Sequence, residues 1–412
     1  MTAIKNNIPV LRFPEFSGEW EAKKLSNCIK SLETGVSVNS EDISVDKNEF
    51  GILKTSAVSK GLFIEYQNKR IIKDDLKRAK LNPTKDSILI SRMNTPELVG
   101  ESGYISRDYP NLFVPDRLWK VSTYDNTVMK WLSYFLTTPK TRYYISSKAT
   151  GTSGSMKNIS KPSLLSINVV LPKSGEQQKI ADFLSSVDKK IGQLEEKKSL
   201  LEEYKKGVMQ KIFSREIRFK ADDGSEFEEW EEKKLGEFME ERSEYPIKDL
   251  PLYSLTIEEG IVPKSERYER SFLVKDEKNA YKVMKENDFA FNPMNLRFGA
   301  LARHKNDFDV SVSKYYNIFF INSRGDAKYF EDFLTSYNMI QYYNKMSTGS
   351  LEEKKRVHYL EFIKFKLLIP SLPEQQKIAN FLTSLDRKIE VVGKELEGVK
   401  EWKKGLLQGM FV

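Results

Sequence analysis

The chain has 412 residues, too many for one ordinary core, so two or three domains are expected. With 39% hydrophobic, 31% charged and 12% aromatic residues, its composition excludes a largely disordered chain. The net charge of +8 favours an anionic partner, of which nucleic acid is the commonest.

Cysteine and histidine are scarce, which excludes several kinds of site. Cys28 is the only cysteine, so an internal disulfide and a thiolate-rich zinc site are excluded, and we expect a small core residue. His304 and His358 are too few for a histidine-based metal cluster. No apolar stretch is long enough to span a bilayer, and residues 1–7 lack the apolar core of a signal peptide, so we expect a cytoplasmic protein.

Residues 1–170 are expected to form the first domain, an α+β body. Strand-like runs at 86–90 and 113–121 alternate with Gly, Asn and Pro turns, and a helical stretch follows near 128–136. Its polar turns place cations, amides and hydroxyls beside strand ends, where they suit phosphates and base edges. For any single residue, a solvated surface side chain is the competing interpretation. The candidate DNA-contacting residues of this body are Lys54, Thr55, Ser56, Arg92, Asn94, Arg117, Lys120, Thr152, Ser153, Ser155 and Lys157.

Residues 171–214 are predicted to form a long helix. Ile180, Leu184, Val187 and Ile191 begin a series of apolar residues at alternating three- and four-residue steps, with charged residues on the other faces. This spacing is typical of the seam of a coiled coil.

Residues 215–232 form a polar linker, and residues 233–368 are expected to form a second body of the same class. Strand-like runs at 289–291 and 310–321 precede a helical stretch near 328–339. The candidate DNA-contacting residues here are Tyr253, Ser254, Thr256, Asn295, Arg297, Tyr315, Tyr316, Asn317, Thr348, Ser350, Lys355 and Arg356.

Residues 369–412 are predicted to form a second long helix with the same apolar seam. Gly393 and Gly398 interrupt its run of good helix formers. A glycine costs about 1 kcal/mol in a helix interior, so we expect fraying there.

The two halves of the chain are copies of each other. The hexapeptide Glu-Gln-Gln-Lys-Ile-Ala at 176–181 recurs 198 residues further on, at 374–379. The front of each copy carries another matching pair, Glu-Trp-Glu-Ala-Lys-Lys-Leu at 19–25 and Glu-Trp-Glu-Glu-Lys-Lys-Leu at 229–235. The bodies between these markers diverge strongly, so the pattern indicates a two-fold repeat of a variable body and a shared tail.

The long helices are predicted to pair with each other, because their apolar seams match position by position. Two unrelated helices, each packed on its own domain, are the alternative. The short linker favours an antiparallel pair, since a parallel one would require it to return the whole helix length. The fold class is therefore α+β: two similar mixed α/β domains separated by a two-helix antiparallel coiled coil, related by a pseudo-two-fold axis. A helix of this length spans roughly 55 Å, or about 16 base pairs of duplex.

Sequence motifs for catalysis are missing. The chain has no Walker-type phosphate loop and no glycine-rich dinucleotide loop. The segment 292–295, Asn-Pro-Met-Asn, resembles a methyltransferase motif for a flipped adenine, but it lacks the second proline and the stacking aromatic residue. We therefore interpret it as a turn and expect no catalytic residues and no metal site.

The repeated tail, the Trp20 and Trp230 segments and the variable bodies together resemble the specificity subunit of type I restriction-modification systems. The resemblance covers essentially the whole chain. It implies that each body is a target-recognition domain for one half of a split DNA site, with the helices as a ruler between the halves.

The resemblance also implies partners. These are two modification subunits that methylate adenine with S-adenosylmethionine, and ATP-dependent, magnesium-requiring restriction subunits, so this chain itself would bind no cofactor. The modification subunits would dock on the tails around Gln177, Gln178, Ile180, Phe183, Gln375, Gln376, Ile378 and Phe381.

Two rival functions remain open. One is a self-sufficient nuclease or methyltransferase with an unrecognised active site, which would show turnover by the chain alone. The other is a coiled-coil scaffold with two protein-binding heads, whose affinity for DNA would show no steep salt dependence.

Overall fold

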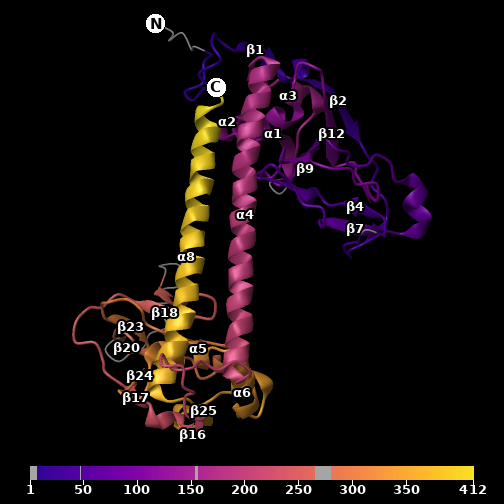
Figure 1. Ribbon diagram of the computed structural model, residues 1–412. Coiled ribbons are helices and arrows are strands. Elements are labelled where there is room, and N and C mark those ends of the chain that lie inside the picture. The colour runs from indigo at the N-terminus through magenta and orange to yellow at the C-terminus, as the bar shows by residue number, and fades with distance from the viewer. Residues whose placement is uncertain (1–6, 47, 154–155, 265–279) are drawn as a thin grey trace. The chain divides into compact units, whose positions relative to one another are not determined.

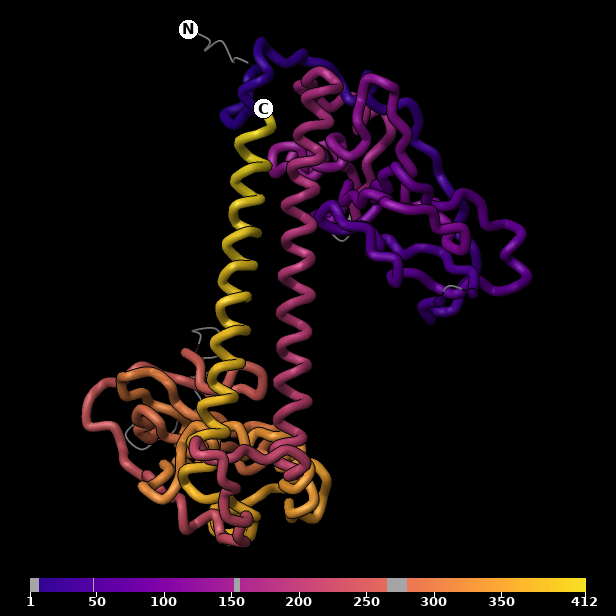
Figure 2. The backbone as a smooth tube through the Cα atoms, viewed as in Figure 1, coloured from indigo at the N-terminus to yellow at the C-terminus, as the bar shows by residue number. Residues whose placement is uncertain are grey.

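The computed structural model describes residues 7–46, 48–153, 156–264 and 280–412, with the side chains of residues 152 and 153 excepted (Figures 1 and 2). The chain divides into two compact units. Unit 1 comprises Met1–Glu195 and Lys394–Val412, and unit 2 comprises Glu196–Gly393. Two long helices, α4 (Ser174–Phe213) and α8 (Leu372–Gly409), each contribute one part to either unit.

The core of unit 1 is built on a four-stranded antiparallel sheet in the order β10-β8-β12-β2. Every residue of its strand Ser87–Ser91 is buried, because the sheet is covered on both faces. The fully buried Trp131 of α1 belongs to the core on one face, and Leu89 to a smaller core on the other. The strands are β2 (Ile29–Thr34), β8 (Ser87–Ser91), β10 (Ser102–Ile105) and β12 (Leu118–Thr123), and the helices are α1 (Met129–Thr137), α2 (Pro139–Ser147) and α3 (Lys161–Leu165).

Smaller sheets extend this body. A second sheet has the order β11-β4-β7-β3, and β1 pairs with β15 so that Glu21 lies opposite Leu171 and Lys24 opposite Asn168. The remaining strands are β1 (Glu21–Lys24), β3 (Ser40–Glu41), β4 (Gly51–Leu53), β5 (Val58–Ser59), β6 (Leu62–Phe63), β7 (Asn68–Ile71), β9 (Met93–Asn94), β11 (Leu112–Phe113), β13 (Thr150–Ser153), β14 (Met156–Asn158) and β15 (Asn168–Leu171).

Unit 2 repeats this plan with different loops. Its sheet has the order β17-β24-β21-β22, and β16 pairs with β25 as β1 does with β15. The strands are β16 (Glu231–Lys234), β17 (Met239–Arg242), β18 (Tyr253–Thr256), β19 (Gly260–Pro263), β20 (Tyr281–Met284), β21 (Phe289–Phe291), β22 (Leu301–Arg303), β23 (Val310–Ser313), β24 (Asn317–Ile321) and β25 (Lys366–Ile369), and the helices are α5 (Ala327–Leu334), α6 (Tyr337–Met346) and α7 (Tyr359–Phe362). The predicted fold class, two similar α/β domains on a helix pair, is confirmed.

The long helices pack antiparallel within each unit, as predicted. In unit 1, Asp188 pairs with Lys403 at 2.5 Å and Glu195 with Lys400 at 3.0 Å, so numbers rise along α4 as they fall along α8. In unit 2, the end of α4 shares a core with the start of α8. Most of the seam residues are buried, and others, such as Ile191, are half-buried. The buried ones include Ile180, Leu184, Val187 and Leu194 of α4 and Ile378, Leu382, Leu385, Val392 and Leu396 of α8.

The second helix shows no break at the two glycines where fraying was expected. α8 is continuous through Gly393 and Gly398, and the seam residues beside these glycines, Val392 and Leu396, are buried. Tertiary packing of an apolar stripe outweighs the low intrinsic propensity of two glycines. Among the described residues, no helix is both long enough and apolar enough to cross a membrane.

The repeated hexapeptide ties the start of each long helix to the body. The Gln177 side chain, fully buried, donates to the carbonyl oxygens of Pro172 (2.8 Å) and Asn126 (3.0 Å) and accepts from the backbone N–H of Val128 (2.8 Å). Val128 stands immediately before α1. The amide of Gln177 is therefore satisfied entirely within unit 1.

Gln375 does the same in unit 2. It donates to the carbonyl of Pro370 at 2.9 Å and accepts from the backbone N–H of Asp326, immediately before α5, at 3.0 Å. The preceding glutamate is also buried in both copies, and an arginine from the polypeptide before the body neutralises it. Arg12 holds Glu176 at 2.7 and 2.8 Å.

In unit 2, Arg218 holds Glu374 at 3.0 and 3.3 Å and also donates to the carbonyls of Phe227 and Glu228. The Glu374 side chain is fully buried. We therefore expect the substitution Arg218→Ala to lower the free energy of unfolding of the full chain by about 3–5 kcal/mol, because it leaves a buried carboxylate without its counter-charge.

Denaturant unfolding followed by circular dichroism measures this effect. The matched control is Lys220→Ala in the same linker, whose ion pair with Glu226 is exposed, so a change of less than about 1 kcal/mol is expected. Equal effects of the two substitutions would show that Arg218 contributes no more than a surface charge.

Candidate nucleic-acid interface

Three segments of unit 1 that carry predicted DNA contacts meet at one edge of the body. The backbone N–H of Arg92 donates to the carbonyl of Arg117 at 3.0 Å, and the N–H of Ile159 donates to the carbonyl of Arg92 at 2.9 Å. Lys157 of β14 lies opposite Asn94 of β9 in an antiparallel pair. The fold therefore brings together Arg92, Asn94, Arg117 and Lys157, which the sequence leaves up to 65 residues apart.

The cations of this cluster are uncompensated. Arg92 rests over the indole ring of Trp119 at 5.9 Å, Arg117 is exposed and Lys157 is half-buried. Over the described part of unit 1, none of the three has an ion-pair or hydrogen-bond partner for its charged group. Such a group of cations at strand ends suits an anionic ligand.

Other predicted contacts of unit 1 lie elsewhere or are already engaged. Lys54 forms an ion pair with Asp42 at 2.7 Å, and Ser56 donates to Gln67. Together with the half-buried Thr55, they follow β4 in the second sheet. The ammonium of Lys120 donates to the carbonyl of Asn82 at 3.1 Å. Ser155 and the side chains of Thr152 and Ser153 lie outside the described residues.

Unit 2 assembles a cluster at the corresponding edge. The N–H of Val357 donates to the carbonyl of Pro293 at 3.0 Å, which joins the turn after β21 to the loop that contains Thr348, Ser350, Lys355 and Arg356. The hydroxyl groups of Ser254 and Tyr316 are 3.5 Å apart, which brings β18 to the start of β24. The segment 292–295 forms the predicted turn. The predicted contacts that are exposed or half-exposed are Tyr253, Ser254, Thr256, Asn295, Tyr315, Tyr316, Asn317, Thr348, Ser350, Lys355 and Arg356.

Arg297 has a structural role that the sequence did not reveal. Its side chain is 8% exposed, its guanidinium donates to the carbonyl of Glu352 at 2.9 Å, and it forms an ion pair with the carboxylate of the same residue. The guanidinium also lies over the ring of Phe298 at 4.3 Å. Lys355 reaches the second carboxylate oxygen of Glu352 at 2.7 Å. Arg297 thus fastens the turn to the loop, which leaves it in poor position to contact a base.

The predicted partner-binding residues separate into buried and accessible groups. Gln177, Gln375, Ile180 and Ile378 are buried within the units, where the glutamines make the bonds described above. The accessible members are Gln178 and Gln376, both exposed, and Phe183 and Phe381, both half-buried.

The first of these phenylalanines belongs to an aromatic group. Phe183 makes edge-to-face contacts with Phe13 at 5.6 Å and with Trp402 at 5.9 Å, and Trp402 is 52% exposed. In unit 2, Phe381 contacts Phe219 at 5.3 Å. Sequence reasoning missed Trp402, although an aromatic residue on the charged side of a coiled-coil helix is itself a signal.

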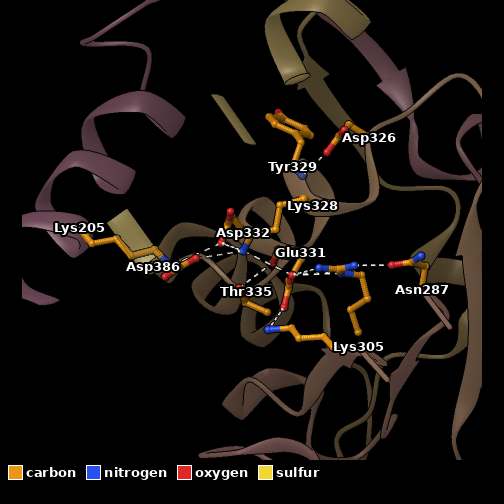
Figure 3. A network of polar contacts seen from close by, with 11 residues as sticks. Lys205, Asn287, Lys305, Asp326, Lys328, Tyr329, Glu331, Asp332, Thr335 and Asp386 are labelled. Carbon is orange, nitrogen blue, oxygen red and sulfur yellow. Dashed lines mark hydrogen bonds and ion pairs between the residues drawn. The ribbon is translucent and has the colours of Figure 1, made fainter. Parts of the chain in front are cut away.

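A charged network that the sequence did not predict joins α5 to the two long helices in unit 2 (Figure 3). Asp386 of α8 pairs with Lys205 of α4 at 2.5 Å and with Lys328 of α5 at 3.3 Å. Asp332 of α5 is 3.1 Å from Lys328. In unit 1 the corresponding Asp188 pairs with Lys403 and accepts a hydrogen bond from the phenol of Tyr134 at 2.7 Å.

Glu331 extends this network on the far side of α5. Lys305 lies 2.7 Å, Arg303 2.9 Å and Lys328 3.4 Å from its carboxylate. Burial alone would raise the pKa of Glu331, but the attraction of Lys328, Arg303 and Lys305 outweighs it and lowers the pKa to about 2.

The lowered pKa of Glu331 predicts a pH dependence of stability. The ionised carboxylate stabilises the folded state fully above its ordinary pKa of 4.5, and this contribution declines as the pH falls toward about 2. We expect Glu331→Gln to destabilise the protein at pH 7 and the difference from wild type to shrink steadily below pH 4.5. Urea unfolding of both proteins at a series of pH values measures it. A difference that is constant from pH 7 to pH 3 would show that the charge of Glu331 contributes nothing.

Within the described ranges, no three His, Cys, Asp or Glu side chains gather in a way that could hold a metal ion. Cys28 is fully buried in the core of unit 1, as expected. Burial raises the pKa of its thiol.

Two similar α/β bodies, each with a cluster of polar loops and each joined to the same helix pair, define a duplicated recognition protein. The sequence pattern of the type I restriction modification DNA specificity domain matches the chain twice, over residues 18–203 and 227–401. The chain belongs to this family.

Two curated relatives match different shares of the chain. The MjaVIII specificity subunit, a type I restriction enzyme component of Methanocaldococcus jannaschii, is 25% identical, and the alignment covers 96% of this chain and 92% of that protein. The EcoEI specificity subunit of Escherichia coli is 26% identical over 42% of this chain and 30% of its own length.

Solved structures share the fold. The S subunit of a type I restriction-modification system from M. genitalium superposes with a TM-score of 0.58 at 17% identity, covering 98% of this chain and 99% of that one. A chain from a structural study of complex assembly and conformational transition in the type I system gives a TM-score of 0.52 at 11% identity, covering 96% of this chain and 98% of that one.

Proposed function

We propose that this chain is a non-catalytic subunit in which each unit reads one half of a split DNA target. The observation that carries the proposal is the repeat of one loop arrangement on two bodies of different sequence. In unit 1, the turn after β8, the start of β12 and the loop after α2 meet at one edge. In unit 2, the turn after β21, the start of β24 and the loop after α6 meet in the same way. Such a surface can vary in its side chains while the fold behind it stays the same.

The long helices set the distance between the halves of the target. The 40 residues of α4 span roughly 60 Å at 1.5 Å per residue. Half-site centres one to one and a half duplex turns apart fit within that length and let both reading clusters enter major grooves on one side of the duplex.

The same tails carry the partners. We assign the docking of two modification subunits to the accessible residues Gln178 and Phe183 in unit 1 and Gln376 and Phe381 in unit 2. A surface that occurs twice in one chain fits two copies of one partner. These subunits would supply S-adenosylmethionine and adenine methylation, and ATP-dependent restriction subunits with magnesium would join them. This chain would bind no cofactor and would act in the cytoplasm.

The family membership does not favour the scaffold alternative, and an enzyme remains the other rival. Incubation of the purified chain with duplex DNA, S-adenosylmethionine and magnesium separates the enzyme from the proposal. Turnover by the chain alone would contradict a non-catalytic role, whereas turnover only after addition of modification subunits supports it.

Binding to DNA should depend steeply on salt. We expect the logarithm of the affinity for duplex DNA to fall linearly with the logarithm of the salt concentration. Lys157→Ala should reduce this slope by about 0.9, the value for one phosphate that the protein no longer neutralises. Fluorescence anisotropy over a salt series measures the slope, with Lys77→Ala, an exposed lysine of the 3-10 helix Lys73–Arg78, as the control that leaves it unchanged. A flat salt response would support the scaffold instead.

The target itself should be divided. Mapping of methylated adenines in a genome that carries this chain with its modification subunits should recover two specified blocks, whose centres lie about 10 to 16 base pairs apart. A single uninterrupted target would contradict the two-reader arrangement.

A further inference from the structure

The two reading clusters occupy corresponding places but carry different chemistry. In the pairing of sheet strands, Leu118 lies opposite Ser91 in unit 1, and Asn317 lies opposite Phe291 in unit 2. Tyr316 therefore takes the place of Arg117. The turn that begins with Arg92 in unit 1 begins with Asn292 in unit 2.

Unit 1 presents two free guanidinium groups on neighbouring strand ends. Arg92 and Arg117 are joined by the backbone hydrogen bond described above, and neither has an acidic partner in the described part of the chain. Arg92 is further oriented by the Trp119 ring beneath it. A planar fork of donors that no carboxylate occupies matches the paired acceptors O6 and N7 of guanine.

In unit 2 the arginine of the turn after β21, Arg297, does not present its guanidinium at the surface. Arg297 is buried against Glu352, so both of its terminal guanidinium nitrogens donate inside the unit. Within the turn itself, the groups left at the surface are the side chain of Asn295 and its apolar neighbours. The Asn295 side chain is exposed and has no hydrogen-bond partner among the described residues. Met294 is 45% exposed and Phe298 is 53% exposed.

This set matches an A·T pair. The amide of Asn295 can accept from N6 and donate to N7 of adenine, and an apolar side chain beside it can contact the methyl group of thymine. The lone amide offers one donor and one acceptor where guanine presents two acceptors, so it discriminates against a G·C pair.

We infer that the two units divide the target by base class: unit 1 reads guanine through Arg92 and Arg117, and unit 2 reads an A·T pair through Asn295, Met294 and Phe298. The inference rests on the proposed function, because it presumes that both clusters face the bases of duplex DNA.

The test selects duplexes from a random library with the full chain and sequences the bound DNA. Wild type is compared with Arg92→Lys, Arg117→Lys and Asn295→Asp. Each lysine keeps the charge but loses the fork, so the preference for one guanine should fall by about 5- to 150-fold. Asn295→Asp keeps the shape but only accepts, so the adenine preference should fall as much and shift toward cytosine.

Each variant carries its own folding control, since the half of the target read by the other unit should be recovered unchanged. Arg78→Lys, the same exchange on the exposed 3-10 helix Lys73–Arg78, should leave both halves unaltered.

Two results would overturn the inference. One is an unchanged preference at every guanine with both arginine variants. The other is that Asn295→Asp alters a position where wild type selects a G·C pair and leaves every A·T position unchanged. A wild-type selection with no base preference at all would instead contradict the proposed function. The two failures are therefore distinguishable.

Discussion

The hydrogen bonds of Gln177 and Gln375 are the constraint on which the rest of the structure depends. Each buried amide links the first turn of a long helix to the residue that precedes a short helix of the body. Because an amide offers both a donor and an acceptor, one side chain fixes two backbone segments at once. A buried amide without these partners would cost free energy, so the bonds and the packing around them form together. This junction sets how each body is attached to its long helix.

The architecture could be predicted from sequence because it depends on two signals, the periodicity of apolar residues and the internal repeat. The apolar steps from Ile180 and from Ile378 indicated the helices, and the short linker indicated their antiparallel direction. The pairing of Asp188 with Lys403 and of Glu195 with Lys400 confirms that direction. The polar turns chosen from the sequence include Arg92, Asn94, Arg117 and Lys157, which the fold does bring together. The domain boundaries and the individual DNA contacts stay predictions.

Other features depend on packing that no local pattern reveals. Arg297 looked like a base reader because its residue type suits guanine, but whether a guanidinium is free depends on Glu352, which lies far along the chain. Gln177 and Ile180 looked like a docking surface because they recur, but they recur for an internal reason. The recurrence of a residue in both copies indicates that it has a role. Its burial then shows whether that role is structural, inside the unit, or at the surface. The ion pairs of Asp386 and Glu331 likewise join residues that are remote in sequence.

The pairing of β1 with β15 and of β16 with β25 has a consequence for how such a chain can change. Each pair brings the polypeptide that enters a body beside the polypeptide that leaves it. The two ends of a body are therefore held together by backbone hydrogen bonds. The segment between the paired strands comprises residues 25–167 in the first copy and the shorter range 235–365 in the second. In both copies the chain then enters the equivalent start of a long helix. An insertion or deletion inside a body therefore need not change the position of the chain where the long helix begins. Loops can be rebuilt, lengthened or trimmed while the frame that holds them keeps its dimensions.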